Sequence, residues 1–351
     1  MKRDSRILVC FNLPHSLYSN YLGKENNSET EVEDLSEKNF FNEMDHIKSS
    51  LSKYYTHVES LGLGPDIRSN IRAIREHKPD LIFNFVESIE GNAELEAYTA
   101  GLYDLLGIPY TGNDFRALGN CLNKSIAKML LKANGVNVPD AFVYNHQNTF
   151  SQLDALKLSF PLMLKLLKED ASIGISERSV VRNKASLKKQ IEFLVKTYKQ
   201  DVLIESFIEG REFNVAVMGG RPLPVSEIDF SGLPKNLPAI VTYEGKWVEG
   251  SEYYKHTVPV CPARISEQLK SKMEEEAVKA YNALSCRDYA RVDIRLGKDN
   301  VPYVIEVNPN PDITSDSGFA RAAAAKGMKH DKFLYKLTQL ALERVKYDTL
   351  V

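Results

Sequence analysis

Two carboxylates near the C-terminus, Asp293 and Glu306, lie where a β-hairpin would bring them face to face. Residues 291–296 alternate polar and apolar side chains, as a half-buried strand does. Residues 297–300, Gly-Lys-Asp-Asn, are typical of a turn. The residues from 301 to 308 then predict a second strand that runs back antiparallel to the first.

A turn centred on residues 299 and 300 separates the hairpin into a polar and an apolar face. The predicted pairs are Asp293 with Glu306 and Arg291 with Asn308 on the polar face, and Val292 with Val307 and Ile294 with Ile305 on the apolar face. Like charges directly opposite on a sheet repel, with Cβ atoms only about 5 Å apart. Mg²⁺ that binds phosphates through a few protein oxygens would offset this repulsion, because hard divalent cations prefer oxygen ligands. The alternatives are a solvated face or a register shifted by two residues; the rigid Asn-Pro-Asn-Pro exit at 308–311 argues against both.

Length and composition favour a soluble protein of two or three domains. The chain has 351 residues, 43% hydrophobic and 26% charged, with 45 Lys and Arg against 47 Asp and Glu, a net charge of −2. A balanced charge without a basic block predicts no nucleic-acid partner. No apolar run approaches the roughly 18 residues of a membrane span, and the N-terminal residues are not typical of a secretory signal. Four distant cysteines predict neither a disulfide framework nor a zinc site, so the expected location is the cytoplasm.

The elements that must position the hairpin follow from hydrophobic periodicity. Over about residues 1–118, apolar runs alternate with amphipathic helices, which predicts a parallel α/β domain. Its expected strands are 6–11, 56–58 and 81–86; its expected helices are 38–54, 65–77 and one that ends at Gly107; and 23–38 is expected to be a surface loop. Farther along, helices are expected at 123–134, 184–198 and 266–284, strands at 160–167, 179–181 and 201–208, an irregular stretch at 229–261, and a pair of helices at the C-terminus.

Four segments in order resemble the ATP-grasp ligases, and among them the D-alanine–D-alanine ligase family. They are Leu-Leu-Gly-Ile-Pro-Tyr-Thr-Gly at 105–112, Asn-Lys at 123–124 with the helix to Pro139, Tyr-Glu-Gly-Lys-Trp at 243–247, and the hairpin with its Asn-Pro-Asn-Pro exit. The resemblance covers most of the chain from about residue 83 onward. It implies a Rossmann-like N-terminal domain (1–118) followed by a two-lobed ATP-grasp domain of the α+β type, with lobes at 119–208 and 209–351.

The same resemblance implies a role for each matching residue. ATP phosphates would be bound by Lys124 and Lys165, and by Ser172 in the small-residue loop 168–174. The hinge Glu205-Ser206-Phe207-Ile208 would read adenine through its backbone, and Glu212 would bind the ribose. Magnesium, or Mn²⁺ in its place, would be held by Asp293, Glu306 and Asn308. An exposed lysine, an ordinary hairpin loop and a solvated carboxylate are the alternatives at these positions.

The residues implied at the reacting end are Arg291, Ser317, Lys246 and Tyr243. Arg291 would stabilise the transferring phosphoryl group and the oxyanion. Ser317 precedes an Ala-rich helix and would bind a substrate carboxylate there, as helix N-termini bind anions, with plain helix capping as the alternative. By the same resemblance, Lys246 and Tyr243 would belong to a loop that covers the site. Trp247, the only tryptophan, could pack that loop down.

The chain departs from the family where the substrates bind. The family's glutamate after the first strand is replaced by Asn-Leu-Pro-His-Ser at 12–16, so Glu87 or Glu90 becomes a candidate partner for a substrate ammonium group, with surface acids as the alternative. Asp312 stands in place of a glycine, and Gly318 in place of a bulky apolar residue. These changes predict a wider, differently charged acceptor pocket.

The function predicted from these residues is an ATP-dependent carboxylate–amine ligase that proceeds through an acyl phosphate, with amino acids or a short peptide as substrates. Two alternatives remain: a genuine D-alanine–D-alanine ligase of cell-wall synthesis, and a nucleotide-binding sensor without turnover. The resemblance also implies a homodimer.

Overall fold

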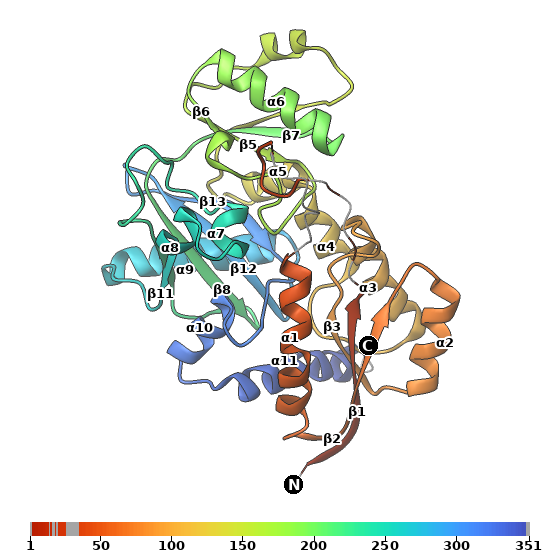
Figure 1. Cartoon of the computed structure of the whole chain (residues 1–351). Coiled ribbons are helices and arrows are strands. Elements are labelled where there is room, and N and C mark those ends of the chain that lie inside the picture. The colour runs from red at the N-terminus through yellow and green to blue at the C-terminus, as the bar shows by residue number, and fades with distance from the viewer. Residues whose placement is uncertain (1, 14, 16–17, 19, 26–34, 349–351) are drawn as a thin grey trace.

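The chain begins with a parallel three-stranded sheet in the order β2–β1–β3. The computed structural model describes residues 2–13, 15, 18, 20–25 and 35–348. The strands are β1 (Arg3–Asn12), β2 (Tyr55–Leu63) and β3 (Leu81–Phe85). All of β3 is buried, because helices cover both faces of the sheet. In Figure 1, α1 (Leu35–Leu51) and α11 (His330–Asp348) lie on one face, and α2 (Ile67–His77) and α3 (Glu94–Leu106) on the other.

A four-stranded antiparallel sheet follows, in the order β4–β7–β5–β6. Its strands are β4 (Ala141–Tyr144), β5 (Leu162–Leu166), β6 (Val180–Val181) and β7 (Val202–Ser206), with short 3₁₀ turns at Phe150–Ala155 and Glu177–Ser179. One face packs against α6 (Lys184–Tyr198) through Leu187 and Ile191. Two helices lead into this sheet, α4 (Phe115–Leu122) and α5 (Lys124–Ala133), and the side chains of Asp114 and Asn123 cap their N-termini.

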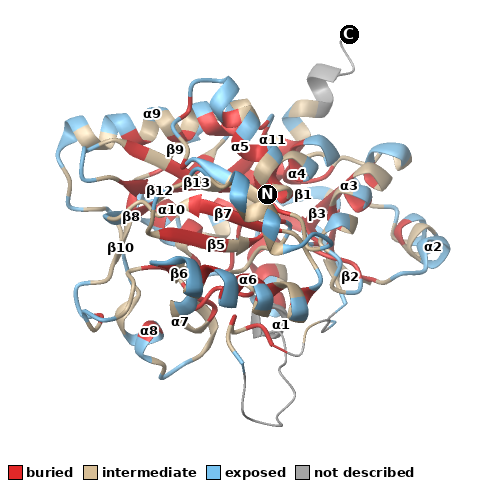
Figure 2. Ribbon diagram, turned by 90° about the horizontal axis from the view of Figure 1, so that it is seen from above, coloured by how far each residue is buried: buried red, intermediate tan, exposed pale blue. Residues whose placement is uncertain are grey.

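The third sheet is antiparallel, in the order β11–β10–β8–β12–β13, with β9 paired to β8. Its strands are β8 (Arg211–Met218), β9 (Arg221–Pro222), β10 (Ser226–Asp229), β11 (Val258–Val260), β12 (Tyr289–Leu296) and β13 (Pro302–Asn308). Helix α9 (Glu267–Ala283) covers one face. Helices α10 (Gly318–Ala325) and α11 return to the first sheet, where Phe319 and Phe333 share a core with Ile7 and Val9. Figure 2 shows the buried strands enclosed by helices whose outer faces are exposed.

The predicted fold class, a Rossmann-like parallel α/β domain followed by a two-lobed α+β domain, is confirmed, and each of the two lobes contains an antiparallel sheet. The prediction that 229–261 is irregular is wrong in part. This stretch contains α7 (Tyr243–Trp247), α8 (Glu252–His256) and β11. Both helices have only five residues, too few to show an apolar period, and each starts at a hydroxyl cap, Thr242 or Ser251.

Three further predictions either differ from the structure or are not tested by it. The second strand is longer than expected, spanning Tyr55–Leu63. Most of the predicted loop at 23–38 lies outside the described residues, and α1 already begins at Leu35. The predicted domain limits remain predictions; the first falls inside α4 and the second between β7 and β8. No helix in the described part of the chain is long and apolar enough to cross a membrane.

Asp288, just before β12, joins three parts of the chain. Its Oδ2 accepts a hydrogen bond from the backbone N–H of Gly112 at 2.9 Å, and its Oδ1 is paired with Arg344 of α11. Arg344 also donates to the carbonyl of Tyr110 at 2.8 Å. Burial raises the pKa of Asp288 even though Arg344 opposes this shift. The contact therefore fixes the start of β12, and with it the hairpin, against the N-terminal sheet.

Replacing Arg344 with methionine leaves the buried Asp288 carboxylate without its cation. We expect the free energy of unfolding of Arg344→Met to fall by about 2–4 kcal/mol at pH 8. The loss should be smaller at pH 5, because protonation removes the uncompensated charge. Urea unfolding at both pH values measures the change. Arg116→Met is the matched control: its exposed pair with Asp114, at 3.7 Å, should contribute less than about 0.5 kcal/mol. Equal losses in the two variants would contradict the role given to Asp288.

Candidate active site

The β12–β13 hairpin has the predicted polar face but not the whole predicted register. The pairs Arg291 with Asn308, Val292 with Val307, and Asp293 with Glu306 are confirmed. The predicted pairing of Ile294 with Ile305 is wrong: Ile294 pairs with Val304. A β-bulge shifts the register between Asp293 and Ile294, and Ile305 is the extra residue. The bulge turns Ile305 toward the same cavity as Glu306.

The Asp293 carboxylate receives hydrogen bonds from three side chains. Arg291 binds it with two of them, Nε to Oδ1 at 2.7 Å and Nη2 to Oδ2 at 2.8 Å. Asn214 of β8 donates to Oδ1 at 2.7 Å, and Asn308 donates to Oδ2 at 3.0 Å. Burial would lower the pKa of Arg291, but Asp293 raises it above its ordinary value. The four bonds hold Arg291, Asp293 and Asn308 in fixed positions on one face of the sheet.

The second carboxylate, Glu306, is paired with a lysine from a different part of the chain. Nζ of Lys124, the first residue of α5, lies 3.0 Å from Oε1 of Glu306 and 3.2 Å from Oδ1 of Asp170. Burial alone would raise the pKa of Glu306, but Lys124 and Lys165 lower it to about 2. Burial would likewise lower the pKa of Lys124, which Glu306 and Asp170 instead raise. Each charge keeps the other ionised.

A second buried network joins two lysines through one glutamate. Glu205 of β7 lies 2.8 Å from Lys165 of β5 and 2.7 Å from Lys128 of α5. Burial would raise the pKa of Glu205, but the two lysines lower it. Among the described residues, this carboxylate therefore faces two ammonium groups, of which that of Lys165 lines the cavity.

Arg295 organises the far end of the cavity. Its guanidinium lies over the ring of Phe207, 4.9 Å from the centroid, and donates to the carbonyl of Ile208 at 2.7 Å. It is also paired with Glu212 at 2.7 Å. Burial raises the pKa of Glu212, although Arg295 opposes this shift. Arg295 thus fixes the hinge 205–208, beside which Met163 provides an apolar cavity wall.

The loop at 169–175 enters the cavity in a constrained conformation. Ala171 and Ser172 both have left-handed backbones, with φ of 52° and 62°. Neither backbone N–H has a hydrogen-bond partner among the described residues. Trp247 of α7 donates from Nε1 to the carbonyl of Ala171 at 3.1 Å, which holds α7 against this loop. Lys246 points into the cavity beside Arg291, and burial, then Arg291, lowers its pKa.

These elements surround one cavity of about 1220 Å³. It brings together nearly all of the residues singled out from the sequence: Lys124, Lys165, Ser172, Glu205, Phe207, Ile208, Glu212, Lys246, Arg291, Asp293, Glu306, Asn308 and Ser317. Tyr243 does not line the cavity. It is buried and stacks on Tyr21, with ring centroids 5.6 Å apart. Ser317 caps α10 by accepting from the N–H of Ala320 at 3.1 Å, with its side chain at the cavity wall.

Comparison with known proteins decides the family. Residues 130–339 match the family described as D-ala D-ala ligase C-terminus, which is more than half of the chain. The chain belongs to the D-alanine–D-alanine ligase family. It is an ATP-dependent ligase of the ATP-grasp type that forms peptide-type carbon–nitrogen bonds.

Individual relatives and solved structures match a larger share of the chain. A D-alanine–D-alanine ligase of Carboxydothermus hydrogenoformans is 32% identical over 76% of this chain and 83% of its own length. An uncharacterized protein of Sinorhizobium fredii is 30% identical over 75% of each chain. Among solved structures, the Bacillus anthracis D-alanine–D-alanine ligase complexed with ATP has a TM-score of 0.73 at 23% identity, covering 98% of this chain and 99% of the other. The Enterococcus faecalis VanG D-Ala:D-Ser ligase has a TM-score of 0.66 at 21% identity, covering 97% and 100%.

In this ligase, a segment that follows β1 packs on the loop at 169–175, which lines the cavity. We call residues 20–24, between β1 and α1, the strap. The backbone N–H of Gly174 donates to the carbonyl of Tyr21 at 3.0 Å, and Ser176 Oγ donates to the carbonyl of Gly23 at 3.0 Å. Gly23 has a φ of +72°, and an added Cβ would lie 2.2 Å from the carbonyl oxygen of Gly174. The strap and the 169–175 loop therefore pack backbone against backbone.

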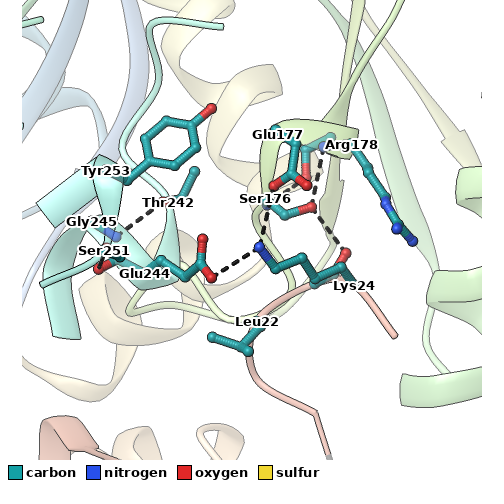
Figure 3. Close-up of polar contacts among 12 residues, drawn as sticks. Leu22, Lys24, Ser176, Glu177, Arg178, Thr242, Glu244, Gly245, Ser251 and Tyr253 are labelled. Carbon is teal, nitrogen blue, oxygen red and sulfur yellow. Dashed lines mark hydrogen bonds and ion pairs between the residues drawn. The ribbon is translucent and has the colours of Figure 1, made fainter. Parts of the chain in front are cut away.

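A charge contact joins the strap to α7. Nζ of Lys24 lies 2.9 Å from Glu244 and 3.7 Å from Glu177, so one ammonium group bridges α7 and the turn after the 169–175 loop (Figure 3). All three side chains are mostly buried. The strap, the loop and α7 form a single cover.

Sequence reasoning missed the residues that hold the predicted ones in place: Lys128, Asn214, Arg295 and the strap. Two of them had a usable signal. Arg295 follows Asp293 by two residues and so shares its face of the strand, and Asn214 lies opposite Asp293 once β8 is paired with β12. The strap and Lys128 contact residues distant in sequence, which no local pattern indicates.

Exchanging the charges of Lys24 and Glu244 tests the cover. Each single change, Lys24→Glu or Glu244→Lys, should destabilise the protein by about 1 kcal/mol, because it places like charges 3 Å apart. The double exchange should recover much of the loss, with a coupling energy of about 0.5–1 kcal/mol from thermal unfolding. The exposed Lys255–Glu252 pair, exchanged in the same way, is the control and should show about 0.3 kcal/mol. Additive losses at Lys24 and Glu244 would show that their contact does not hold the cover.

Proposed function

We propose that this ligase uses Mg·ATP to join two amino-acid-like substrates other than a pair of D-alanines. The observation that carries the proposal is the convergence of Lys124, Lys165, Arg291 and two carboxylates in one cavity. An ATP-dependent ligation needs this combination, because it must hold a triphosphate, a metal ion and an acyl phosphate in turn.

ATP fits the lysine-lined wall of the cavity. Lys124 and Lys165 would bind phosphate oxygens, and the unpaired amides of Ala171 and Ser172 would add backbone donors. The adenine would lie against Phe207 and the hinge backbone at Ile208, and the ribose beside Glu212. Arg295 keeps that end of the cavity in shape by holding Phe207, Ile208 and Glu212.

The donor atoms on the hairpin fit Mg²⁺, or Mn²⁺ in its place. Asp293 and Glu306 face each other, and Asn308 bonds Asp293 through its nitrogen, which leaves its oxygen as a donor to a metal. Within the described residues, no group of three or more His, Cys, Asp or Glu is arranged for a metal. Two carboxylates and an amide suit Mg²⁺, which commonly completes its coordination with phosphate and water. When bound, the metal would supply charge neutralisation to the phosphates.

The chemistry that these residues support has two steps. A carboxylate oxygen of the first substrate attacks the γ-phosphorus, the bond to the β–γ bridging oxygen breaks, and ADP leaves. The amine of the second substrate then attacks the acyl carbon, inorganic phosphate leaves, and the amine loses one proton. Arg291, fixed by two bonds to Asp293, would stabilise the charge on the transferring phosphoryl group and then on the oxyanion. Lys246 would add a second positive charge from the cover.

The acceptor end of the cavity supports substrates other than two D-alanines. Asp312 and Asp316 both line it, and the single hydroxyl of Thr314 lies 2.7 Å from one carboxylate and 3.1 Å from the other. Gly318 at the start of α10 leaves room beside them. A genuine D-alanine–D-alanine ligase is the alternative, since several relatives carry that name. A sensor without turnover is the second alternative, which the complete set of lysines, carboxylates and Arg291 disfavours.

Phosphate release from Mg·ATP, measured with D- and L-amino acids singly and in pairs, tests the proposal. Mass spectrometry of the products identifies the amide. We expect release with a pair other than D-alanine alone, and a loss of at least about 100-fold in Glu306→Gln, which removes one charge from the metal site. Arg116→Met, on the surface, should keep the wild-type rate. A D-alanyl-D-alanine product would establish the first alternative. The sensor would be favoured if neither the wild-type protein nor Glu306→Gln turned over ATP and both bound the nucleotide equally well.

We also propose that the protein is a homodimer that forms through α3 and α4. Tyr98, Leu102 and Leu105 lie at i, i+4 and i+7 on one face of α3, and Phe115 extends this stripe onto α4. Leu105 is 87% exposed and Tyr98 69%. Exposed apolar stripes of this kind are typical of association surfaces.

Leu105→Glu should dissociate the dimer, because a buried charge without a partner opposes association. Sedimentation velocity of wild type and variant measures the mass. Met129→Glu, exposed on α5 outside the stripe, is the control and should leave the mass unchanged. A monomeric wild-type protein would contradict the proposal.

A cytoplasmic location is proposed as well, since all four cysteines are free thiols, and cell fractionation would test it.

A further inference from the structure

Glu96 of α3 differs from the other buried carboxylates of the cavity because no cation among the described residues contacts it. Glu205, Glu212, Asp293 and Glu306 each lie within 3.0 Å of a lysine or an arginine. Glu96 is only 8% exposed, lines the same cavity, and has one hydrogen bond among the described residues, from Asn310. Buried carboxylates normally have a positive partner, so this one requires an explanation.

Asn310 fixes the position of Glu96 relative to the hairpin. Its Nδ2 donates to Oε1 of Glu96 at 3.0 Å and to the carbonyl of Val86 at 3.2 Å, and its Oδ1 accepts from the hydroxyl of Tyr289 at 3.1 Å. Every polar atom of the amide is used, so its orientation is fixed. Because Asn310 follows the proposed metal ligand Asn308 by two residues, Glu96 is held beside the end of the hairpin that carries the reacting groups.

The described charged groups that affect the pKa of Glu96 are negative. Burial raises the pKa of Glu96 well above its ordinary value, the bond from Asn310 opposes this, and Glu87 and Asp170 raise the pKa further. Asp170 is itself 3.2 Å from Lys124, so Glu96 lies in the same neighbourhood as the lysine assigned to the phosphates. A positive group of a ligand would be stabilised at this point of the wall, and a second negative group would be repelled.

We propose that Glu96 binds the ammonium group of the substrate whose carboxylate is phosphorylated. The inference rests on the proposed function and narrows it: the first substrate is an amino acid with a free ammonium group, not a simple carboxylic acid. Arg291 and the metal site would hold the carboxylate end while Glu96 holds the ammonium end. Glu87, a candidate from the sequence, lines the same wall but is exposed, and Glu90 does not line the cavity.

A hydroxylamine trap tests the first substrate without knowledge of the second. Hydroxylamine attacks an acyl phosphate and gives a hydroxamate, so Mg·ATP, hydroxylamine and one acid suffice. The acids are matched pairs that differ only in the amino group: D- or L-alanine with propionate, D- or L-serine with 3-hydroxypropionate, and D- or L-glutamate with glutarate. We expect hydroxamate from an amino acid and none from its desamino partner.

Glu96→Gln keeps the size of the side chain and an oxygen for Asn310 but removes the charge. Its KM for the active amino acid should rise roughly 10- to 100-fold, while its KM for ATP stays within about twofold of wild type. A merely structural role would move both constants or neither. Glu96→Asp keeps the charge and should retain the discrimination against the desamino acid. Asp104→Asn, exposed near the far end of α3, is the control and should match wild type.

The outcomes separate this inference from the proposed function. Equal hydroxamate from the desamino acids, an unchanged KM in Glu96→Gln, or the KM effect in Glu87→Gln in its place would overturn the inference and leave the ligase intact. No hydroxamate from any acid, with ATP bound, would overturn the proposed function and the inference with it.

Discussion

The repulsion between Asp293 and Glu306 across the hairpin determines where the positive side chains of the cavity must be. Each carboxylate is neutralised by a cation from a different place: Arg291 from the same strand, and Lys124 from the helix that follows the N-terminal domain. The two pairs therefore connect the hairpin to the wall that would bind phosphates. A metal ion and a triphosphate add opposite charges to these same groups, so the cations can change from carboxylate to phosphate partners without moving far. This arrangement of fixed charges supports the proposed phosphoryl transfer.

Local chemistry was enough to predict the central face of the hairpin, and the same chemistry explains where the prediction failed. The turn residues at 297–300 and the alternation of side chains indicate the three correct pairs near the proposed metal site. The bulge at Ile305 leaves no sign in this pattern, because Val304, Ile305 and Val307 are apolar in either register. The bulge matters for the cavity and not for the core. Without it, Ile305 would point into the core, and the cavity would lose the apolar surface that this side chain provides.

Contacts between residues distant in sequence account for what the sequence did not reveal. Asp288 and Arg344, Lys24 and Glu244, and Glu96 and Asn310 are separated by 56, about 220 and 214 positions, and each pair joins different elements. Family resemblance identified residues expected to touch ATP, since those are recognised by motif. It did not identify the residues that hold them, such as Arg295 and Asn214, which ordinary strand periodicity places but does not distinguish from surface polar residues.

The strap connects one wall of the proposed substrate site to the segments that cover the proposed phosphate site. It belongs to the same β1–α1 connection as Asn12 and His15, which line the cavity near Glu87, and it packs on the 169–175 loop and α7, which cover the proposed phosphate site. Water can hydrolyse an acyl phosphate before the amine attacks it, so a ligase of this kind benefits from excluding water from the site. In this chain the strap and the cavity wall at Asn12 and His15 belong to one connection between β1 and α1. Because the strap is hydrogen-bonded to the 169–175 loop, a displacement of that loop would be transmitted to this wall.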